Sequence, residues 1–154
     1  MKLGKSSGSN ARSESSKTRW EVQDAALKHC YHIKYAESAD GIQWNRTGTI
    51  CIDFQNQDEY VMSRPCVIRD DGIYKMWYSY RGQSYRLGYA ESIDGITWER
   101  KDQSVGIHVS ESGWDSEMIE YSFVFDHAGQ RYMLYNGNGY GKTGIGLAVL
   151  DQGR

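Results

Sequence analysis

Apolar and polar residues alternate with a period of two along most of the chain, in short runs separated by turn residues. Such alternation is typical of β-strands. The most distinctive stretch, Tyr35–Trp44, occurs again as Tyr89–Trp98, 54 positions later, with differences at two of its ten positions. Each copy predicts a strand, a tight Asp-Gly turn and a second strand, because Asp and Gly tolerate the positive φ of such turns. A hairpin repeated at this spacing indicates a repeat architecture.

The middle of the chain predicts a complete antiparallel meander over Met62–Lys101. The single proline, Pro65, falls near the start of its first strand, where a missing N–H is tolerated. Asp70 and Asp71 precede Gly72 and are interpreted as turn formers. The third expected strand keeps large apolar residues on both of its faces, as does the second. The expected strands are Met62–Arg69, Ile73–Arg81, Tyr85–Ser92 and Ile96–Lys101.

The same pattern extends to either side of this meander. Gly129–Tyr135 matches Gly72–Tyr78 at an offset of 57 positions, which predicts a further sheet after a long connection. Its strands are expected at Glu117–Phe125, Gln130–Asn136 and Ile145–Leu150, with a glycine-rich loop over 137–144. On the N-terminal side, strands are expected at His29–Ser38 and Ile42–Arg46, followed by an extended segment over 48–54.

Sheets of about 55 residues with two apolar faces stack around an axis as propeller blades, so the fold expected is all-β, with about 2.5 β-propeller blades over residues 19–154. A β-sandwich is the alternative, but it gives no reason for a repeat at this spacing. Residues 1–18 are almost free of apolar side chains and are expected to be a disordered tail or an expression remnant. Residues 19–28 fit either a strand or a helical turn.

Composition excludes several classes of function. The 154 residues carry a net charge of −2, so the chain has no basic footprint for nucleic acid. No run of eighteen apolar residues is present, so no membrane span is expected, and no secretory leader is recognisable. A cytoplasmic location is therefore favoured, with a secreted parent that lost its N-terminus as the alternative. The three cysteines lack CxxC spacing and are interpreted as small strand residues.

Three stretches together carry a family resemblance: residues 63–78, the two Ser-x-Asp-Gly-x-x-Trp hairpins, and residues 116–125. They resemble five-bladed β-propeller glycosidases, namely glycoside hydrolase family 43 and its invertase-like relatives. The resemblance covers Tyr31–Leu150, about half of such a propeller. It implies a carbohydrate ligand, no cofactor, and carboxylates that meet at the propeller centre, because hydrolysis needs one group to protonate the leaving oxygen and another to attack or to activate water.

The resemblance implies a role for Glu120 as the catalytic acid, at the start of an inner strand. Glu117 lies on the opposite face of that predicted strand, so only one of the two carboxylates can point into a given cleft. One blade earlier, Ser63 or Arg64 stands where relatives carry Asp, a departure that removes a stabilising carboxylate. The residues expected to bind substrate are Arg64, Trp114, Glu117 and Asn136, with Tyr121 as a further stacking surface; each has a structural alternative in a salt bridge or the core.

Two other patterns are weaker. His29, Cys30 and His32 look like metal ligands, but strand alternation places His29 opposite the other two, so no metal site is expected. The loop 136–142 resembles a phosphate cradle without its Gly-Lys-Ser/Thr order, and is interpreted as a connecting loop. Asp40 and Asp94 are expected to hydrogen-bond their own turns.

The sequence therefore leaves three functions open: a glycosidase-like protein, a non-catalytic sugar-binding module and a protein-interaction propeller fragment. An incomplete propeller exposes apolar faces and unpaired edges. Two chains are therefore expected to associate as a homo-oligomer.

Overall fold

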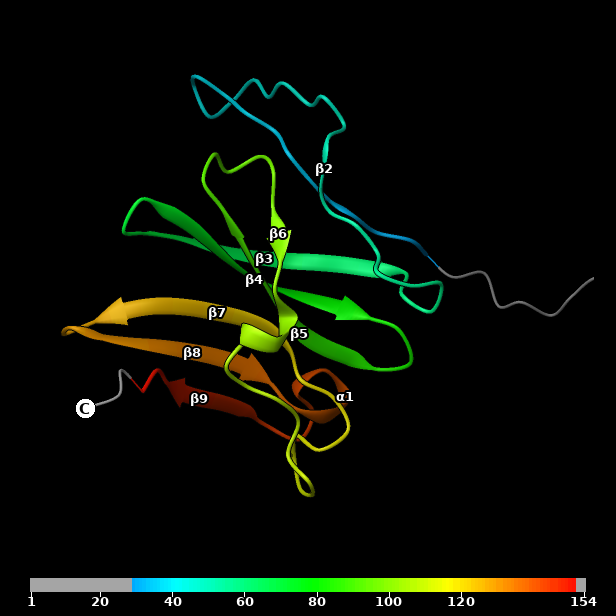
Figure 1. Cartoon of the computed structure of the whole chain (residues 1–154). Coiled ribbons are helices and arrows are strands. Elements are labelled where there is room, and N and C mark those ends of the chain that lie inside the picture. Colours follow the sequence, from blue (N-terminus) through cyan, green and yellow to red (C-terminus); the bar gives the residue numbers. More distant parts are fainter. Residues whose placement is uncertain (1–28, 152–154) are drawn as a thin grey trace, which may run out of the picture.

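The computed structural model describes residues 29–151, and these form three antiparallel β-sheets (Figure 1). The expected tail at 1–18 and the ambiguous segment at 19–28 lie outside the described residues. Within the described range, helical structure is confined to one 3-10 turn and one short helix. The prediction of an all-β chain built from antiparallel sheets is therefore confirmed. The two helical elements are η1, Asp102–Ser104, and α1, Asn138–Gly141.

The central sheet is the predicted meander, with its strands paired in chain order. β4 and β5 have the predicted bounds, and the turn before β4 has positive φ at both Asp71 and Gly72. The fourth strand is shorter than the predicted Ile96–Lys101, because the N–H groups of the first two residues of that range donate to the Asp94 carboxylate instead of to a strand. The strands are β3, Val61–Asp70; β4, Ile73–Arg81; β5, Tyr85–Ser92; and β6, Glu99–Arg100.

The N-terminal sheet is smaller than the repeated hairpin predicts, and the strands expected over 29–38 and 42–46 are wrong in extent. Only an isolated bridge between Glu37 and Asn45 joins the two arms of the hairpin. The Asp40 carboxylate accepts the N–H groups of the residues two and three positions after it, so the turn's own side chain replaces ladder bonds. The strands present are β1, Ile33–Lys34, and β2, Ile50–Ile52.

The third sheet keeps the predicted bounds of β8, but β7 begins at Glu120 and not at Glu117. The N–H groups of Glu117 and Met118 donate to the side-chain oxygen of Asn138, at 2.8 and 3.1 Å, and are therefore unavailable to a strand. The loop predicted over 137–144 contains the short helix α1. The strands are β7, Glu120–His127; β8, Gln130–Asn136; and β9, Ile145–Val149.

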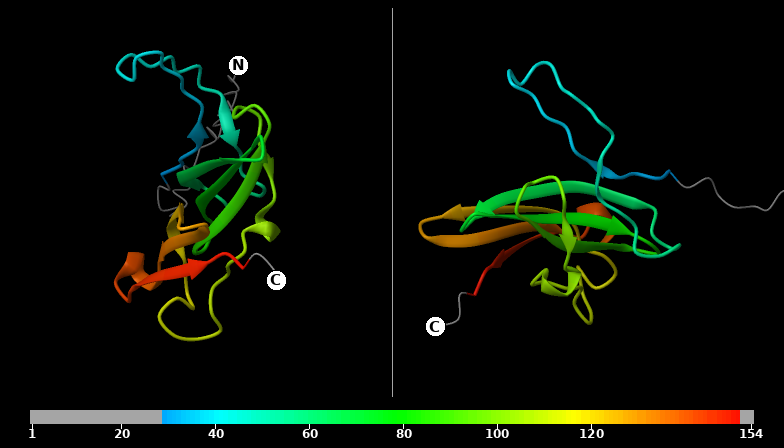
Figure 2. Two further views of the ribbon diagram at one scale, coloured as in Figure 1. Left: turned by 90° about the vertical axis from the view of Figure 1, so that its left-hand side faces the viewer. Right: turned by 45° about the horizontal axis from the view of Figure 1, so that its top comes forward.

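Hydrophobic side chains pack on both faces of the central sheet, as the sequence predicts. Figure 2 shows the central sheet lying between the N-terminal hairpin and the third sheet. This layering is consistent with a partial propeller-like fold; the number of blades stays a prediction. The cluster toward the N-terminal sheet contains Ile33, Ile52, Met62, Met76, Tyr78 and Ala90, and the one toward the third sheet contains Trp77, Leu87, Tyr89, Val105, Ile119, Val124, Met133 and Tyr135.

The sequence repeat is also visible in how a tyrosine ring packs in each sheet. Tyr78 on β4 and Tyr135 on β8 are related by the 57-residue offset. A Cβ atom at Gly88 would lie 2.4 Å from the Tyr78 ring, and one at Gly146 would lie 2.4 Å from the Tyr135 ring. Both glycines therefore allow a tyrosine to lie flat against the next strand. The Tyr78 hydroxyl donates to the Asp102 carboxylate at 2.6 Å.

Candidate functional site

Four strand ends meet at a cleft of about 670 Å³: the beginnings of β3, β5 and β7 and the end of β4. Tyrosine is the commonest residue in its wall, and the wall contains two arginines. No carboxylate is among the described residues that line the cleft. Aromatic and arginine side chains offer flat apolar area together with hydrogen-bond donors, a combination suited to polar ligands with apolar faces. The lining residues are His29, Tyr31, Tyr60, Val61, Ser63, Arg64, Arg81, Tyr85, Tyr121 and Tyr140.

Two β-bulges shape the wall of this cleft, one in β3 after Ser63 and one in β7 after Glu120. These positions are related by the same 57-residue offset. The residue that follows each of them has positive φ, 52° at Arg64 and 55° at Tyr121. Bulges re-aim side chains, and strained non-glycine backbone is often found at functional sites. Here the bulges turn the Arg64 and Tyr121 side chains into the cleft wall.

Glu120 lies beneath this wall and is fully buried, with 0% of its surface exposed. Neither of its carboxylate oxygens has a hydrogen-bond partner among the described residues. Burial raises the pKa of the Glu120 carboxyl to about 7, although the positive charge of Arg81 opposes the rise. A carboxyl group with this pKa holds its proton near neutral pH and can donate it, as a general acid must.

Other polar atoms around the strand ends are similarly buried without a partner in the described part of the chain: the hydroxyl oxygens of Ser63 and Ser122 and the Nε atom of Arg81. Ser79, by contrast, accepts the N–H of Tyr121 at 2.8 Å and ties β4 to β7. Unpaired buried polar groups cost stability, so proteins keep them mainly where they serve a purpose. Their concentration here marks the floor of the cleft as the leading candidate site.

Arg81 is held in place by aromatic rings. Its guanidinium carbon lies 5.2 Å from the ring centre of Tyr85 and 5.6 Å from that of Tyr60. Its Nη1 atom donates to the Tyr140 hydroxyl at 2.9 Å. Arg64, on the rim, lies 5.2 Å from the ring centre of Tyr121. Cation–π contacts of this kind fix the orientation of a guanidinium without neutralising its charge.

The other residues predicted to bind substrate lie away from the cleft wall. Trp114 stacks on Tyr135 and packs over the glycines of the next strand connection. The Glu117 side chain is exposed, and its backbone carbonyl accepts a hydrogen bond from Arg86 at 2.9 Å. Asn136 pairs with Glu120 across the β7–β8 ladder. Of the predicted binding residues, only Arg64 and the stacking residue Tyr121 line the cleft.

Arg81, Tyr85 and Tyr140 are part of the cleft wall but were not singled out in the sequence. Each lies at or beyond the end of a predicted strand, and each is an aromatic or arginine residue. The available signal was this position: residues at the strand ends on the side of Glu120 come together in a propeller-like stack of sheets. Alternation alone could not separate them from the many other tyrosines.

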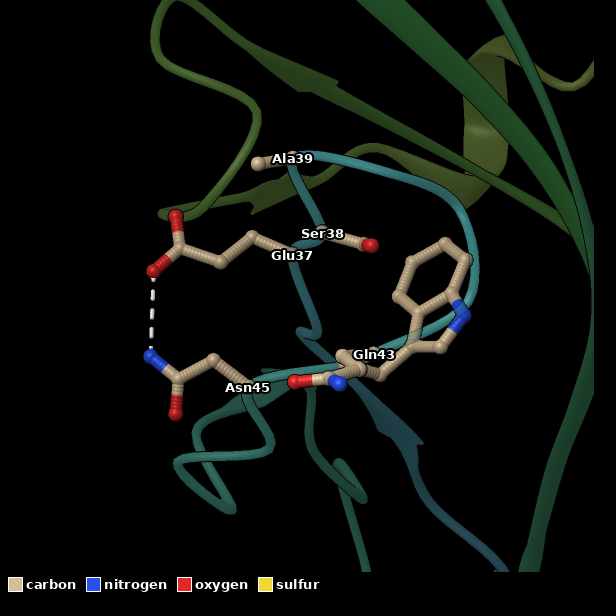
Figure 3. Close-up of a pocket in the computed structure, with 6 residues that line it drawn as sticks. Glu37, Ser38, Ala39, Gln43 and Asn45 are labelled. Carbon is tan, nitrogen blue, oxygen red and sulfur yellow. Dashed lines mark hydrogen bonds between the residues drawn. The ribbon is translucent and has the colours of Figure 1, made fainter.

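A second pocket lies in the tip of the first repeated hairpin and is formed by that hairpin alone (Figure 3). The Asn45 side chain donates to the Glu37 carboxylate at 3.1 Å. The Trp44 indole donates to the Gly41 carbonyl, as Trp98 does to the matching glycine of the second hairpin. Since Trp98 is half-buried against the core while Trp44 is exposed, these bonds serve the turn and do not build a site.

The aspartates of the two repeated hairpins bond their own turns, as predicted. The carboxylate of Asp40 and that of Asp94 each accept two backbone N–H groups of the residues that follow, at 2.8 Å in every case. These bonds lower the pKa of both carboxyl groups, in the case of Asp94 to about 2. Both groups are therefore committed to turn formation.

Among residues 29–151, no group of three His, Cys, Asp or Glu side chains is placed to hold a metal ion. In the cluster considered as a metal site, His32 pairs instead with Asp53, 3.2 Å away. No helix in the described range is both long and apolar enough to cross a membrane.

Comparison with known proteins identifies relatives without an assigned function. No family model matches the chain. Two uncharacterized proteins of Mycobacterium tuberculosis, MT1551 of strain CDC 1551 and Rv1502 of strain H37Rv, are 52% and 51% identical over 119 residues. These residues are 77% of this chain and 40% of each relative. The chain thus spans less than half the length of the curated relatives that it matches.

Solved structures place the fold. A glycoside hydrolase matches with a TM-score of 0.63 and 20% identity, over 80% of this chain and 37% of the other. A complex of BT0996 with RGII in its name matches with a TM-score of 0.60 and 19% identity, again over 80% and 37%. At these identities the likeness shows the fold alone. The chain therefore has an all-β, glycoside-hydrolase-like fold, of which it forms a part.

Proposed function

We propose that this protein is a carbohydrate-active protein of the glycoside hydrolase type, in which Glu120 is the catalytic acid. The observation that carries the proposal is a buried carboxyl group with a pKa raised to about 7, beneath a cleft walled by tyrosines. Tyrosine rings stack on the apolar faces of sugars, and a carboxyl group that is still protonated near neutral pH can protonate a glycosidic oxygen.

Hydrolysis also needs a second carboxylate, as base or nucleophile. No Asp or Glu side chain is among the described residues that line the cleft. We therefore propose that the second carboxylate comes from outside residues 29–151, either from the rest of a longer protein or from a second copy of the chain. In that case the described residues supply the acid and much of the sugar-binding wall.

Replacing Glu120 with Gln tests the acid role. Glu120→Gln should lower glycosidase activity about 10²-fold or more, because positioned general acids contribute rate factors of this size. The loss should be largest for substrates with an alkyl or sugar leaving group, and smallest for aryl glycosides whose leaving group needs little protonation. The assay compares kcat on both substrate types in the complete protein.

Glu117→Gln is the matched control, because that carboxylate is three residues away but exposed. It should leave both activities near the unsubstituted level. Equal activity of Glu120→Gln and the unsubstituted protein on alkyl-linked substrates would remove Glu120 from the mechanism.

A binding protein without turnover is the second candidate, and the burial of Glu120 favours it. The side chain is fully buried, so a substrate reaches it only if the wall above it moves. Sugar binding at the cleft without any hydrolysis by the complete protein would favour this function over the first. The protein-interaction alternative would be favoured instead if no sugar binds.

We also propose that the outward face of the third sheet associates with a second copy of the chain. Trp77 and Tyr89 are buried where the central sheet packs on the third sheet. Their repeat partners, Leu134 and Leu147, lie at offsets of 57 and 58 and are exposed. The third sheet thus presents to solvent the kind of face that packs on a further sheet in the central one. The exposed apolar residues of the third sheet include Phe123, Leu134, Ile145, Leu147 and Val149.

Light scattering tests this association. The unsubstituted chain should be a stable oligomer at micromolar concentration, and Leu147→Glu should shift it to the monomer, because a charge at the centre of an apolar interface is left without water or a partner. Ile93→Glu is the control, since Ile93 is 84% exposed on a turn outside this face. A stable monomer of the unsubstituted chain at micromolar concentration would overturn the proposal.

A further inference from the structure

The charge of the cleft wall is one-sided. Arg64 and Arg81 both line it, and neither forms an ion pair with a carboxylate among the described residues. Two arginines elsewhere in the sheets do pair: Arg100 with Glu59 and Asp102, and Arg131 with Asp70 and Asp126. The chain has more acidic than basic residues, so the unpaired arginines are not explained by a shortage of carboxylates.

The two arginines are linked by a short row of aromatic rings. Arg81 lies over Tyr85, whose ring meets that of Tyr121 edge-on with 5.8 Å between centroids, and Arg64 lies over Tyr121. A ligand that spans this row meets a guanidinium at each end and aromatic faces between them. A sugar with an anionic substituent has this combination of features.

Arg81 is the better placed of the two to anchor an anion. It is half-buried, its orientation is set by two rings and by the Tyr140 hydroxyl, and its buried Nε atom has no partner in the described part of the chain. Guanidinium groups bind carboxylates and phosphates through two parallel N–H donors, and a fixed orientation lowers the entropy lost on binding. Arg64 is exposed on the rim, where a charge acts mainly on encounter.

Glu120 beneath the wall does not supply the missing counter-charge. No ion pair or hydrogen bond joins it to either arginine in the described residues, and its two oxygens are shielded from the cleft. The charge of the wall is therefore open to an incoming anion.

We propose, on the premise that the cleft binds carbohydrate, that its ligand is an anionic sugar whose charged group is held by Arg81. Arg64 attracts the same charge from the rim, and the tyrosine row contacts the sugar ring. The carboxylate of a uronic acid, a sulfate and a phosphate share the chemistry that a guanidinium recognises, so probes of each kind are needed to distinguish them.

The test measures binding by calorimetry to the complete protein, with four matched probes: a galacturonate oligosaccharide, the neutral galactose oligosaccharide of the same length, and sulfated and phosphorylated galactosides. At least one anionic probe should bind about tenfold or more tightly than the neutral one, since charge-assisted hydrogen bonds are worth roughly twice neutral ones. Its affinity should also fall with added salt. The anionic probe that binds most tightly identifies the charged group.

Arg81→Gln should remove this preference for the anion, and Arg64→Gln should weaken it several-fold while leaving the fold intact, because Arg64 is exposed. Arg81→Lys keeps the charge but loses the fork, and should restore only part of the preference. Arg69→Gln is the matched control: Arg69 is on the same strand as Arg64 and lies 5.3 Å from the ring centre of Tyr74, but it is outside the cleft. It should leave all affinities unchanged.

The outcomes separate this inference from the function on which it rests. Neutral and anionic probes of equal affinity, or an anion preference that survives both Arg64→Gln and Arg81→Gln, would overturn the anionic ligand and leave carbohydrate binding intact. No binding of any of the four probes would overturn both.

Discussion

Glu120→Gln should increase the free energy of unfolding at pH 8 by about 3 kcal/mol, although it removes the proposed catalytic group. The pKa of the Glu120 carboxyl is raised from 4.5 to about 7 by burial. A difference of one in pKa between the folded and unfolded states corresponds to about 1.4 kcal/mol, so ionising this group in the folded protein costs about 3 kcal/mol. Among the variants considered, this is the only one expected to stabilise the protein.

The sign of the effect follows from proton linkage. Between pH 4.5 and 7 the folded protein holds a proton on Glu120 that the unfolded chain has released, so stability falls as pH rises through this interval. Below pH 4.5 the carboxyl is protonated in both states and the cost is absent. Above pH 7 the group is ionised in both states and the cost is complete. The gain from Glu120→Gln should therefore be near zero at pH 4 and constant above pH 7.

Urea unfolding at pH 4, 6 and 8 measures this difference, and Glu117→Gln is the control because Glu117 is exposed. The control should show little change at any of the three values. A gain from Glu120→Gln that is the same at pH 4 and pH 8 would show that Glu120 is not the source of the pH dependence. Loss of stability at pH 8 would show that the ionised carboxylate has a partner in the folded protein.

Arg100→Met should reduce the free energy of unfolding by about 3–5 kcal/mol, the usual cost of removing one partner from a buried ion pair. Arg100 donates to both Glu59 oxygens, at 2.8 and 2.9 Å, and its Nε donates to Asp102 at 2.7 Å. Only 9% of its side chain and 6% of that of Glu59 are exposed. Methionine keeps much of the length of the side chain but leaves two buried carboxylates without their cation.

Lys101→Met is the matched control, because the next residue also forms ion pairs, with Glu91 and Glu99, but is more exposed. Exposed pairs contribute little to stability, so its unfolding free energy should change little. Equal effects of the two substitutions would show that burial of the Arg100 pair does not govern its contribution. Denaturant unfolding at neutral pH measures both variants.

Much of the fold could be predicted from the sequence, because strand alternation and turn chemistry are local. The bounds of β4, β5 and β8 follow from alternating side chains between Gly-containing turns, and the structure has them as predicted. The predictions failed at the repeated hairpins, where Asp40 and Asp94 bind backbone N–H groups that strands would have used. In these places a side chain competed with the ladder, and alternation does not register that competition.

The candidate site could be predicted only in part. The repeat and the family resemblance pointed to Glu120 and Arg64, and these two residues lie at the cleft floor and wall. Trp114 and Asn136 were chosen for their residue type, and they lie beside β8 and in the β7–β8 ladder. Residue type cannot say which end of a strand a side chain will reach when the sheet is assembled, and that is what decides membership of a cleft.

The sequence by itself determined the all-β class, the length of the repeat and the two apolar faces of the central sheet, because each depends on patterns that can be read along the chain. Only the tertiary structure decided that Glu120 is fully buried and that Arg81 stands among Tyr60, Tyr85 and Tyr140. Burial and the raised pKa that follows from it arise where separate strands meet, and no pattern within one strand contains that information.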